Sequence, residues 1–281
     1  MSFQYGYAAE DIVKEDRVTW QEIETIKEWN LNANVPILLD EQVVGFLLSC
    51  DRDVEFTKKT IADYFRVRTY AKHLFNNRDV ERDDLQLQLA TLEYIAFPEK
   101  TEDGCVIIYH KLHDPTYSKY NMAESMKLLF MTIDAALYEY PPTGLIILFD
   151  MKGLGLMHLT RVRLGCVKAF FEYCQDCLPV KLKTIHVLNT VYFVDKIMNI
   201  IKPFMNKELY DLMYFHPPNL NMEKFYRSYI SKKCLPSDYG GDLPNTRILH
   251  EMNTKRLAEL KPFFDAEEAF RSSFNNKLNQ N

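Results

Sequence analysis

The chain has 281 residues, and its 34 lysines and arginines against 39 aspartates and glutamates give a formal net charge of −5 at pH 7. This length predicts one large domain or two smaller ones, and a content of 47% hydrophobic and 26% charged residues excludes a wholly disordered chain. The mild acidity argues against nucleic-acid binding, which usually requires an excess of basic residues.

The first 80 residues are predicted to be helical. Apolar side chains recur there at helical intervals, as in Trp20, Ile23 and Ile26. Asp40 and Asp53 each precede a further stretch with one apolar face, so both are predicted to cap helices. No strand pattern interrupts this region, which we expect to form a separate helical lobe.

Strands and helices are predicted to alternate after residue 100. Short apolar runs predict strands, and longer amphipathic runs predict helices. The predicted strands cover residues 105–109, 144–150, 184–188 and 214–216, and the predicted helices cover residues 122–138, 159–177 and 191–202. A polar helix is predicted from residue 253, with a loose tail at residues 271–281. The alternation predicts crossover units and a sheet with parallel strand pairs.

The sequence predicts an intracellular protein that does not span a membrane. Its purest apolar run, residues 145–149, is far shorter than the roughly 18–20 residues of a spanning helix. The first residues lack the basic and apolar regions of a secretory signal. Six cysteines in a long chain without such a signal indicate free thiols in a reducing compartment. A cytoplasmic location is therefore expected.

A glycine turn at Gly153 and Gly155 follows a predicted strand and precedes a predicted helix, where a phosphate-binding loop would lie. His158 occupies the position of the third glycine of the dinucleotide fingerprint, so dinucleotide binding is disfavoured. Asp150 ends the preceding strand and is predicted to cap the turn. No nucleophile, base and oxyanion-stabilising group come together in the sequence. We therefore predict no catalytic residues and no cofactor.

Two pairs of metal-ligating residue types are present, but neither predicts a metal site. Cys174 and Cys177 have the spacing of a redox dithiol, yet they lie near the end of a predicted helix, whereas an active dithiol begins one. No second cysteine pair completes a zinc site with them. His110 and His113 likewise lack a partner pair. We interpret the cysteines as small buried apolar residues and expect no metal.

Two consecutive predicted helices carry broad apolar stripes. The first, at residues 159–177, includes Phe170, and the second, at residues 191–202, presents Ile197 and Ile201 opposite a charged side. Such stripes are typical of an ordinary core. The wall of a ligand cavity has the same pattern, so the spacing alone leaves both interpretations open.

Three motifs in the second half of the chain resemble one family. They are IHVLN at residues 185–189, IIKPF at residues 200–204 and LPSDYGG at residues 235–241. In combination they resemble the CRAL-TRIO family, which includes cellular retinaldehyde-binding and tocopherol-transfer proteins. The resemblance extends over roughly residues 35–245.

The resemblance implies an α/β fold in which an N-terminal all-helical lobe precedes a CRAL-TRIO α/β lobe. A mixed, largely parallel sheet would enclose an apolar pocket there, closed by a gate helix at residues 191–202. The expected domains are a helical N-terminal lobe at residues 1–82, the lipid-binding domain at residues 83–250, and a C-terminal helix and polar tail at residues 251–281.

The function implied by the resemblance is the intracellular binding and transfer of one small hydrophobic ligand, which is tocopherol-, retinoid- or isoprenoid-like. The ligand would exchange with membranes through the mobile gate helix, without enzymatic chemistry. The ligand-binding residues implied by position are Phe149, Leu154, Leu156, Val162, Phe170, Tyr173, Cys174, Leu178, Val180, Ile185, Val194, Ile197 and Ile201.

The resemblance also implies transient contact with a membrane surface through a basic cleft that takes phosphoinositide head groups. Lys181 and Lys183 match two positions of that cleft. Cys50 replaces an arginine and Glu208 replaces a lysine at two others. Because half of the positive charges are missing and one is reversed, phosphoinositide contact is expected to be weakened.

Two other classes of function are compatible with the sequence. A non-transferring regulatory or protein-interaction module would have its pocket filled by bulky side chains such as Phe170 and Tyr173. A cavity too small for a lipid would favour that class. A dehydrogenase that used the Gly153 turn would bind a nicotinamide cofactor.

Overall fold

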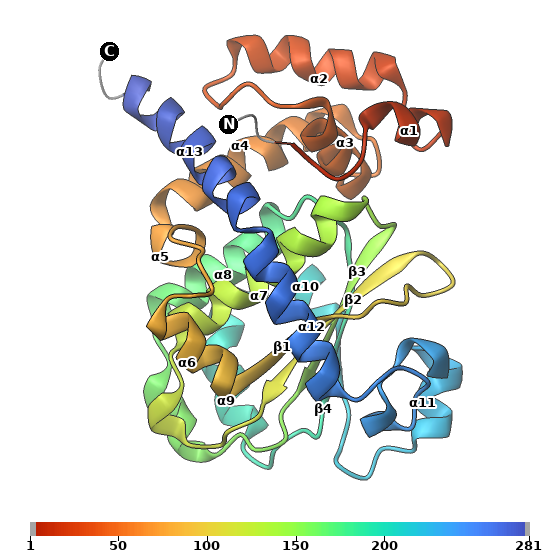
Figure 1. The fold of residues 1–281 in the computed structure, drawn as a ribbon, viewed down its shortest axis with the longest axis vertical. Helices are drawn as coiled ribbons and strands as arrows, with labels where there is room; N and C mark the ends of the chain where they lie inside the picture. Colours follow the sequence, from red (N-terminus) through yellow and green to blue (C-terminus); the bar gives the residue numbers. More distant parts are fainter. Residues whose placement is uncertain (1–3, 279–281) are drawn as a thin grey trace.

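Five helices form the N-terminal lobe in the computed structural model, which describes residues 4–278 (Figure 1). The Asp53 carboxylate accepts a hydrogen bond from the Phe56 amide at 2.9 Å, which confirms the predicted cap. The predicted cap at Asp40 is wrong, because Leu39 holds the cap position and Asp40 begins the helix. The helices are α1 (Ala9–Lys14), α2 (Trp20–Asn32), α3 (Asp40–Ser49), α4 (Val54–Tyr70) and α5 (Lys72–Phe75).

A five-stranded sheet forms the centre of the second lobe, with its strands in the order β1-β2-β3-β4-β5. β1 pairs antiparallel with β2 and the other neighbours are parallel, so the mixed, largely parallel sheet is confirmed. β3 is buried along nearly its whole length, as expected of a strand covered on both faces. The strands are β1 (Leu92–Ala96), β2 (Cys105–Leu112), β3 (Gly144–Asp150), β4 (Leu182–Leu188) and β5 (Met213–Phe215).

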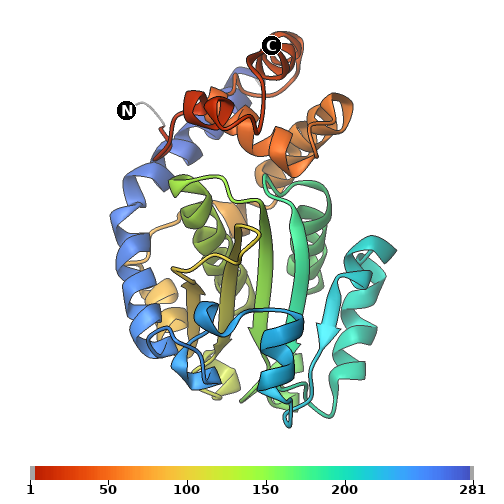
Figure 2. The ribbon, with the colours of Figure 1, turned by 90° about the vertical axis from the view of Figure 1, so that its right-hand side faces the viewer.

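Helices cover both faces and both edges of the sheet. Figure 2 shows α7 and α8 behind the sheet, α11 in front of it, α12 along the β1 edge, and α9 and α10 beyond the β5 edge. These elements are α7 (Met122–Glu139), α8 (Leu164–Asp176), α9 (Val194–Ile201), α10 (Lys207–Asp211), α11 (Met222–Ser228) and α12 (Thr246–Glu259). The remaining helices are α6 (Asp83–Thr91) and α13 (Lys261–Leu278), and the single 3₁₀ turns include η2 (Leu156–Arg161) and η3 (Lys202–Phe204).

Several elements differ from the sequence prediction, and three of them have a clear physical reason. β1 was not expected, and it is stabilised by long-range contacts: the Tyr94 amide donates to His250 Nδ1 at 3.1 Å, which shields this sheet edge. The predicted helix at residues 159–177 is divided, because η2 ends at Arg161 and α8 begins at Leu164. The C-terminal helix starts seven residues earlier than expected, at Thr246, where the Asn245 side chain caps it.

The predicted loose tail is also wrong for residues 271–278, which continue α13; residues 279–281 lie outside the described part of the chain. The cause is Arg271, which is buried in spite of its charge. Its guanidinium donates to the Phe75 carbonyl at 2.9 Å and pairs with Glu267 at 2.6 Å. These contacts hold α13 against the N-terminal lobe (Figure 1).

A buried cluster of five charged residues joins the two lobes, and we call it the interlobe ion cluster. Asp134 on α7 pairs with Arg68 and with Arg78, each at 2.8 Å. Glu267 on α13 pairs with Arg78 and with Arg271. Burial alone would raise the pKa of Glu267, but the three arginines lower it to about 2. Each charged group therefore has an opposite charge beside it, as a buried ion requires.

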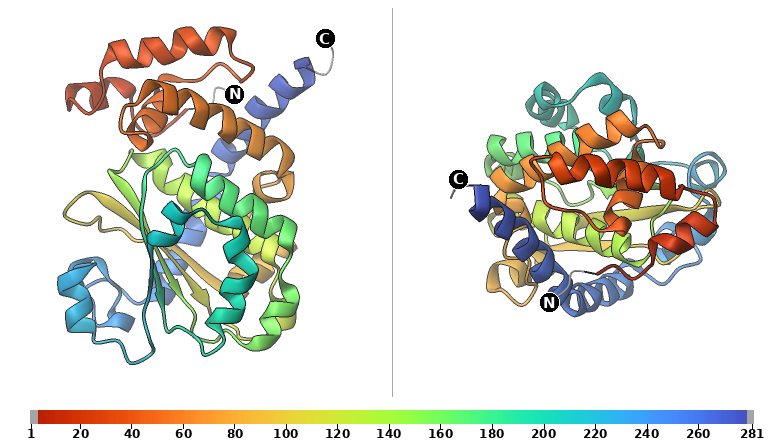
Figure 3. Two further views of the ribbon diagram at one scale, coloured as in Figure 1. Left: turned by 180° about the vertical axis from the view of Figure 1, so that it is seen from behind. Right: turned by 90° about the horizontal axis from the view of Figure 1, so that it is seen from above.

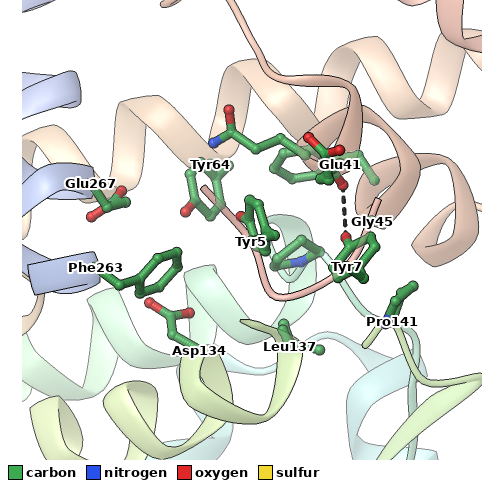
Figure 4. Close-up of a pocket in the computed structure, with 13 residues that line it drawn as sticks. Tyr5, Tyr7, Glu41, Gly45, Tyr64, Asp134, Leu137, Pro141, Phe263 and Glu267 are labelled. Carbon is green, nitrogen blue, oxygen red and sulfur yellow. Dashed lines mark hydrogen bonds between the residues drawn. The ribbon is translucent and has the colours of Figure 1, made fainter. Parts of the chain in front are cut away.

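The segment before α1 passes between the lobes next to this cluster (Figure 4). The Gly6 amide donates to the Tyr138 carbonyl at 2.9 Å, and the Tyr7 hydroxyl donates to the Glu41 carbonyl at 2.9 Å. The cavity left among these side chains is only about 30 Å³, which is room for about two water molecules. This region is therefore a packed junction and not a site for an organic ligand.

Candidate functional site

An apolar cavity of about 220 Å³ lies between the sheet and helices α7, α8, α9 and α10. Side chains from all five strands contribute to its lining. Among the described residues that line it, none carries a formal charge, and the polar side chains are limited to Tyr94, His110, Tyr120, Ser125 and the thiol of Cys174. Such a lining suits an apolar molecule, because few polar groups of the cavity would lose hydrogen bonds to water when that molecule binds.

The shape of the cavity follows from the order of the strands. Tyr94 and His110 contribute from β1 and β2, whereas Met213 and Phe215 contribute from β5, at the opposite edge. From β2 to β5 there are three strand spacings, or about 14 Å. The described lining therefore runs across the whole sheet, from β1 to β5.

Six of the thirteen expected ligand-binding residues line this cavity. Their side chains come from different elements, so only the tertiary fold brings them together. They are Phe149 on β3, Phe170 and Cys174 on α8, Ile185 on β4, and Ile197 and Ile201 on α9.

The other seven lie elsewhere in the structure. Tyr173 is buried in the main core, where its hydroxyl accepts from Arg68 Nη2 at 2.6 Å. Leu156 is 40% exposed on η2. Leu154 packs beside the main core, Val162 packs beside a small cluster between α8 and α10, Val194 begins α9, and Leu178 and Val180 line a neighbouring cleft.

Several lining residues were not expected from the sequence. Ile147 and Met151 are two positions from Phe149, and Val187 is two positions from Ile185, so strand alternation could have identified them. The residues of α7 and β1 carry no such signal. His110 was considered only as half of a metal pair, because nothing in its neighbourhood along the chain places it beside a cavity. The further lining residues not expected are Met126, Leu129, Phe171, Met198, Leu209, Met213 and Phe215.

α9 covers the cavity at the β5 edge of the sheet (Figure 3). Ile197, Met198 and Ile201 face the cavity, while Asp195 and Lys196 are exposed on the other side. No residue of α9 itself is buried. Tyr192, just before the helix, is 88% exposed. The helix therefore rests on the cavity through one apolar face and is otherwise in contact with solvent.

A second cavity, of about 230 Å³, lies at the junction of the lobes and contains the positions expected to take a phosphoinositide. Lys181, Cys50 and Glu208 line it together, although they are far apart in the sequence. Lys181 is held by Asp51 in an ion pair of 2.5 Å. Lys183 is exposed on β4 and does not line this cleft. The described lining thus has one lysine against the three carboxylates of Asp51, Asp176 and Glu208.

The cysteines and Asp150, which the sequence analysis also considered, occupy structural positions. All six cysteines are free and buried, and burial raises the pKa of the Cys174 and Cys177 thiols. Asp150 Oδ1 accepts from the Lys152 amide at 2.7 Å, which confirms its capping role. Among residues 4–274, whose side chains the structure describes, there is no group of three or more metal-ligating side chains placed to hold an ion. No helix within the same range is long and apolar enough to cross a bilayer.

Comparison with known proteins identifies the family of this chain. A family model described as the CRAL/TRIO domain matches residues 92–241, and another, described as a Pinta-like UBA domain, matches residues 15–85. The alpha-tocopherol transfer protein-like protein of Homo sapiens is 24% identical over 248 residues, covering 83% of this chain and 70% of that protein. Clavesin-1 of Xenopus laevis is 23% identical over 224 residues, covering 77% of this chain and 64% of that protein.

The fold also has a counterpart among solved structures. The crystal structure of Sfh5 superposes with a TM-score of 0.51 at 13% sequence identity, covering 75% of each chain. At that identity the match concerns the fold alone.

Proposed function

The chain belongs to the CRAL/TRIO domain family, and from this membership and the cavity geometry we propose that it binds one small hydrophobic molecule and transfers it between membranes. The observation that carries the proposal is the cavity lining: about 220 Å³ enclosed by apolar side chains without a charged residue among those described. Burial of about 300 Å² of ligand surface at ~25 cal/mol/Å² would supply roughly 7 kcal/mol before the cost of association.

α9 is the element that would open for exchange. Its apolar face stabilises the closed state by covering the cavity, and the same face can contact lipid once the helix moves. The turn η3, which contains Pro203, follows the helix directly and limits it at that end. Solvent surrounds the rest of α9, so its displacement breaks few other contacts. The relatives named for tocopherol transfer support a transfer role for this chain.

Coupling to phosphoinositides is the part of the family's behaviour that we expect to be weak here. The single lysine of the cleft is already paired with Asp51, and Glu208 adds a negative charge beside it. A multiply charged head group would therefore meet repulsion as well as attraction. Transfer to vesicles should change little when a phosphoinositide is added, and substitution Glu208→Lys should increase the response.

The test of the proposal is a titration followed by a transfer assay. Purified protein is titrated with a fluorescent hydrophobic probe, and tocopherol, retinal and a diacyl phospholipid compete for it. The loaded protein is then mixed with acceptor vesicles, and movement of the probe is timed. We expect saturation at one probe per chain and transfer to vesicles. A protein that binds none of these molecules would contradict the proposal.

The small volume of the apolar cavity supports a second candidate function. The protein would then be an interaction module whose pocket has closed. Phe170 and Phe171 both project into the cavity, and their rings lie 5.2 Å apart. This candidate predicts a stable protein that stays empty in the presence of every competitor. It also predicts that substitution of Phe170 by alanine creates binding where the unmodified chain has none.

A further inference from the structure

The two ends of the segment that covers the cavity are attached in different ways. This segment consists of α9 and η3, and we call residues 194–204 the cover segment. Its N-terminal connection begins at Asn189, whose backbone is left-handed with a φ of 49° and whose side-chain amide donates to Asp150 Oδ1 at 2.8 Å. Asp150 is 2% exposed and also accepts from the Lys152 amide and the Tyr239 hydroxyl. The connection therefore starts on a buried carboxylate that other donors hold in place.

Two further residues fix this N-terminal end. The amide and the hydroxyl of Thr190 both donate to the His216 carbonyl, at 3.0 and 2.8 Å. The His216 amide donates in turn to the Val187 carbonyl of β4 at 2.8 Å, so this contact continues the edge of the sheet. Phe193, immediately before α9, is 3% exposed. Because these groups are buried or belong to the sheet, water does not replace them without a cost in free energy.

A glutamine side chain joins the C-terminal end of the cover segment to α8. Gln175 donates through Nε2 to the Phe204 carbonyl at 3.2 Å and accepts through Oε1 from the Asn206 amide at 2.5 Å. Lys202 and Pro203 are exposed beside these contacts. Gln175 also lines the second cavity, at the junction of the lobes. The hydrogen bonds at this end therefore lie where water can compete for them.

The same pair of hydrogen bonds also occurs at a buried position of the fold. Gln88 on α6 donates to the Lys119 carbonyl at 2.8 Å and accepts from the Asn121 amide at 2.9 Å. In both places the amide belongs to an asparagine that caps the next helix, which is α7 after Asn121 and α10 after Asn206. Gln88 is 1% exposed, whereas Gln175 is half-buried. Release of Gln88 would leave polar groups without partners, whereas release of Gln175 exchanges its bonds for bonds to water.

We propose that Gln175 is the latch of the cavity, which holds the C-terminal end of the cover segment closed, and that the segment opens from that end while the Asn189 end acts as the hinge. This inference rests on the proposed function and adds what controls the rate of exchange. Gln175 does not line the apolar cavity, so it acts on the ligand through the position of the cover segment. Its loss weakens the closed state equally with and without ligand. The ligand should therefore enter and leave faster without binding less tightly.

The experiment measures equilibrium affinity and exchange rates separately. The probe is N-phenyl-1-naphthylamine, a small uncharged dye that fluoresces in apolar surroundings. Titration gives its dissociation constant, stopped-flow mixing with the empty chain gives the association rate, and mixing of the loaded chain with excess phosphatidylcholine vesicles gives the dissociation rate. Gln175→Met keeps an unbranched side chain and removes both hydrogen bonds. We expect both rates to rise about tenfold while the dissociation constant stays within about twofold.

Two further variants connect the effect to the latch. Gln175→Glu keeps the acceptor for the Asn206 amide and loses the donor, so the rates should rise by less than in Gln175→Met. Gln88→Met is the matched control, because it removes the same two hydrogen bonds at a place away from the cover segment. It should lower stability toward urea and leave both rates within about twofold of the unmodified chain.

Two measurements test which end opens. Asn189→Gly keeps the left-handed backbone and removes the contact with Asp150. Because Thr190 still holds this end, both rates should rise by less than about threefold. Hydrogen exchange of the unmodified chain adds a test that needs no variant. The Asn206 amide should exchange at least about tenfold faster than the Thr190 amide, since the first is released each time the latch opens.

The outcomes separate the two proposals. Unchanged rates in Gln175→Met, a shift of about tenfold or more in its dissociation constant, an equal rise in Gln88→Met, or a larger rise in Asn189→Gly would overturn the latch. Slower hydrogen exchange at Asn206 than at Thr190 would do the same. In each of these cases the dye still binds, so the proposed function would stand. Failure of the dye, tocopherol, retinal and a diacyl phospholipid to bind the unmodified chain would instead overturn the proposed function itself.

Discussion

The cavity and the interlobe ion cluster bury polar side chains in opposite ways. In the cluster, Asp134 and Glu267 are each flanked by arginines at ion-pair distance, and almost no space remains beside them. In the cavity, Tyr94, His110 and Ser125 lie among apolar side chains and about 220 Å³ is left open. Charged groups that satisfy one another without leaving space indicate a structural junction, whereas an apolar lining around empty volume indicates a place for another molecule.

The largest effect is expected from breaking the ion cluster. Glu267→Gln leaves three buried arginines with one carboxylate, so the free energy of unfolding should fall by about 3–5 kcal/mol. Asp265→Asn on the same helix is the control, since its pair with Lys261 is exposed and should cost less than about 1 kcal/mol. Urea unfolding measures both. Equal losses in the two variants would remove the distinction between the cluster and the surface.

Acidification should weaken the sheet before it weakens the ion cluster. Burial lowers the pKa of His110 and His186 to about 4, so the unfolded chain, with histidines near 6.5, binds more protons between pH 6.5 and 4. Stability therefore falls as pH falls through this window, by up to about 3 kcal/mol for each histidine. The contribution of Glu267 to stability is fully present above pH 4.5, the usual pKa of a glutamate. It is lost only as the pH falls toward 2.

Urea unfolding at a series of pH values between 7.5 and 4 tests this order. His110→Phe removes one of the titrating groups and should make the curve visibly less steep between pH 6.5 and 4. Glu267→Gln should lower the whole curve while leaving that slope in place. A stability that does not change between pH 7 and 5 would contradict the assigned burial of the histidines.

Two neighbouring isoleucines distinguish packed core from cavity wall. Ile108 and Ile147 are partners in the β2–β3 register, but only Ile147 lines the cavity. Ile108→Phe should overpack the core and cost about 1–3 kcal/mol. Ile147→Phe should cost less and reduce probe binding about tenfold or more, because it occupies the ligand's volume. Equal costs, with binding unaffected, would mean that the cavity is not a ligand site.

The smallest effect concerns the surface beside α9. Tyr192 is 88% exposed, so Tyr192→Ala should leave probe affinity unchanged but slow transfer to vesicles a few-fold, as aromatic contact with the membrane is lost. Leu31→Ala is the control, because this side chain is 70% exposed on the other lobe. Stopped-flow transfer rates compare them. Equal rates in the two variants would count against α9 as the exchange route.

The sequence was most informative where the structure depends on local pattern. β3 and the Asp53 cap are recognisable from a few consecutive residues. The family motifs identified the fold class, and the resemblance placed six side chains at the cavity. What was missed depends on partners distant in the chain: β1 is completed by His250 from α12, and the end of α13 is held by a carbonyl of α5.

The lining of the cavity shows why this limit matters for function. Tyr94, His110 and Ser125 come from three elements, and none of them belongs to a recognisable motif. Along the chain, His110 resembles one half of an incomplete metal pair. Its place in the lining of the cavity is supplied only by the tertiary structure.

The central claim is that the cavity holds one neutral hydrophobic molecule. Native mass spectrometry of the protein purified from cells without detergent tests it most directly, combined with identification of the extracted compound. We predict a complex of one chain with one uncharged hydrophobic molecule, and loss of this complex in Ile147→Phe. A chain that is always empty, or one occupied by a charged phospholipid, would contradict the account.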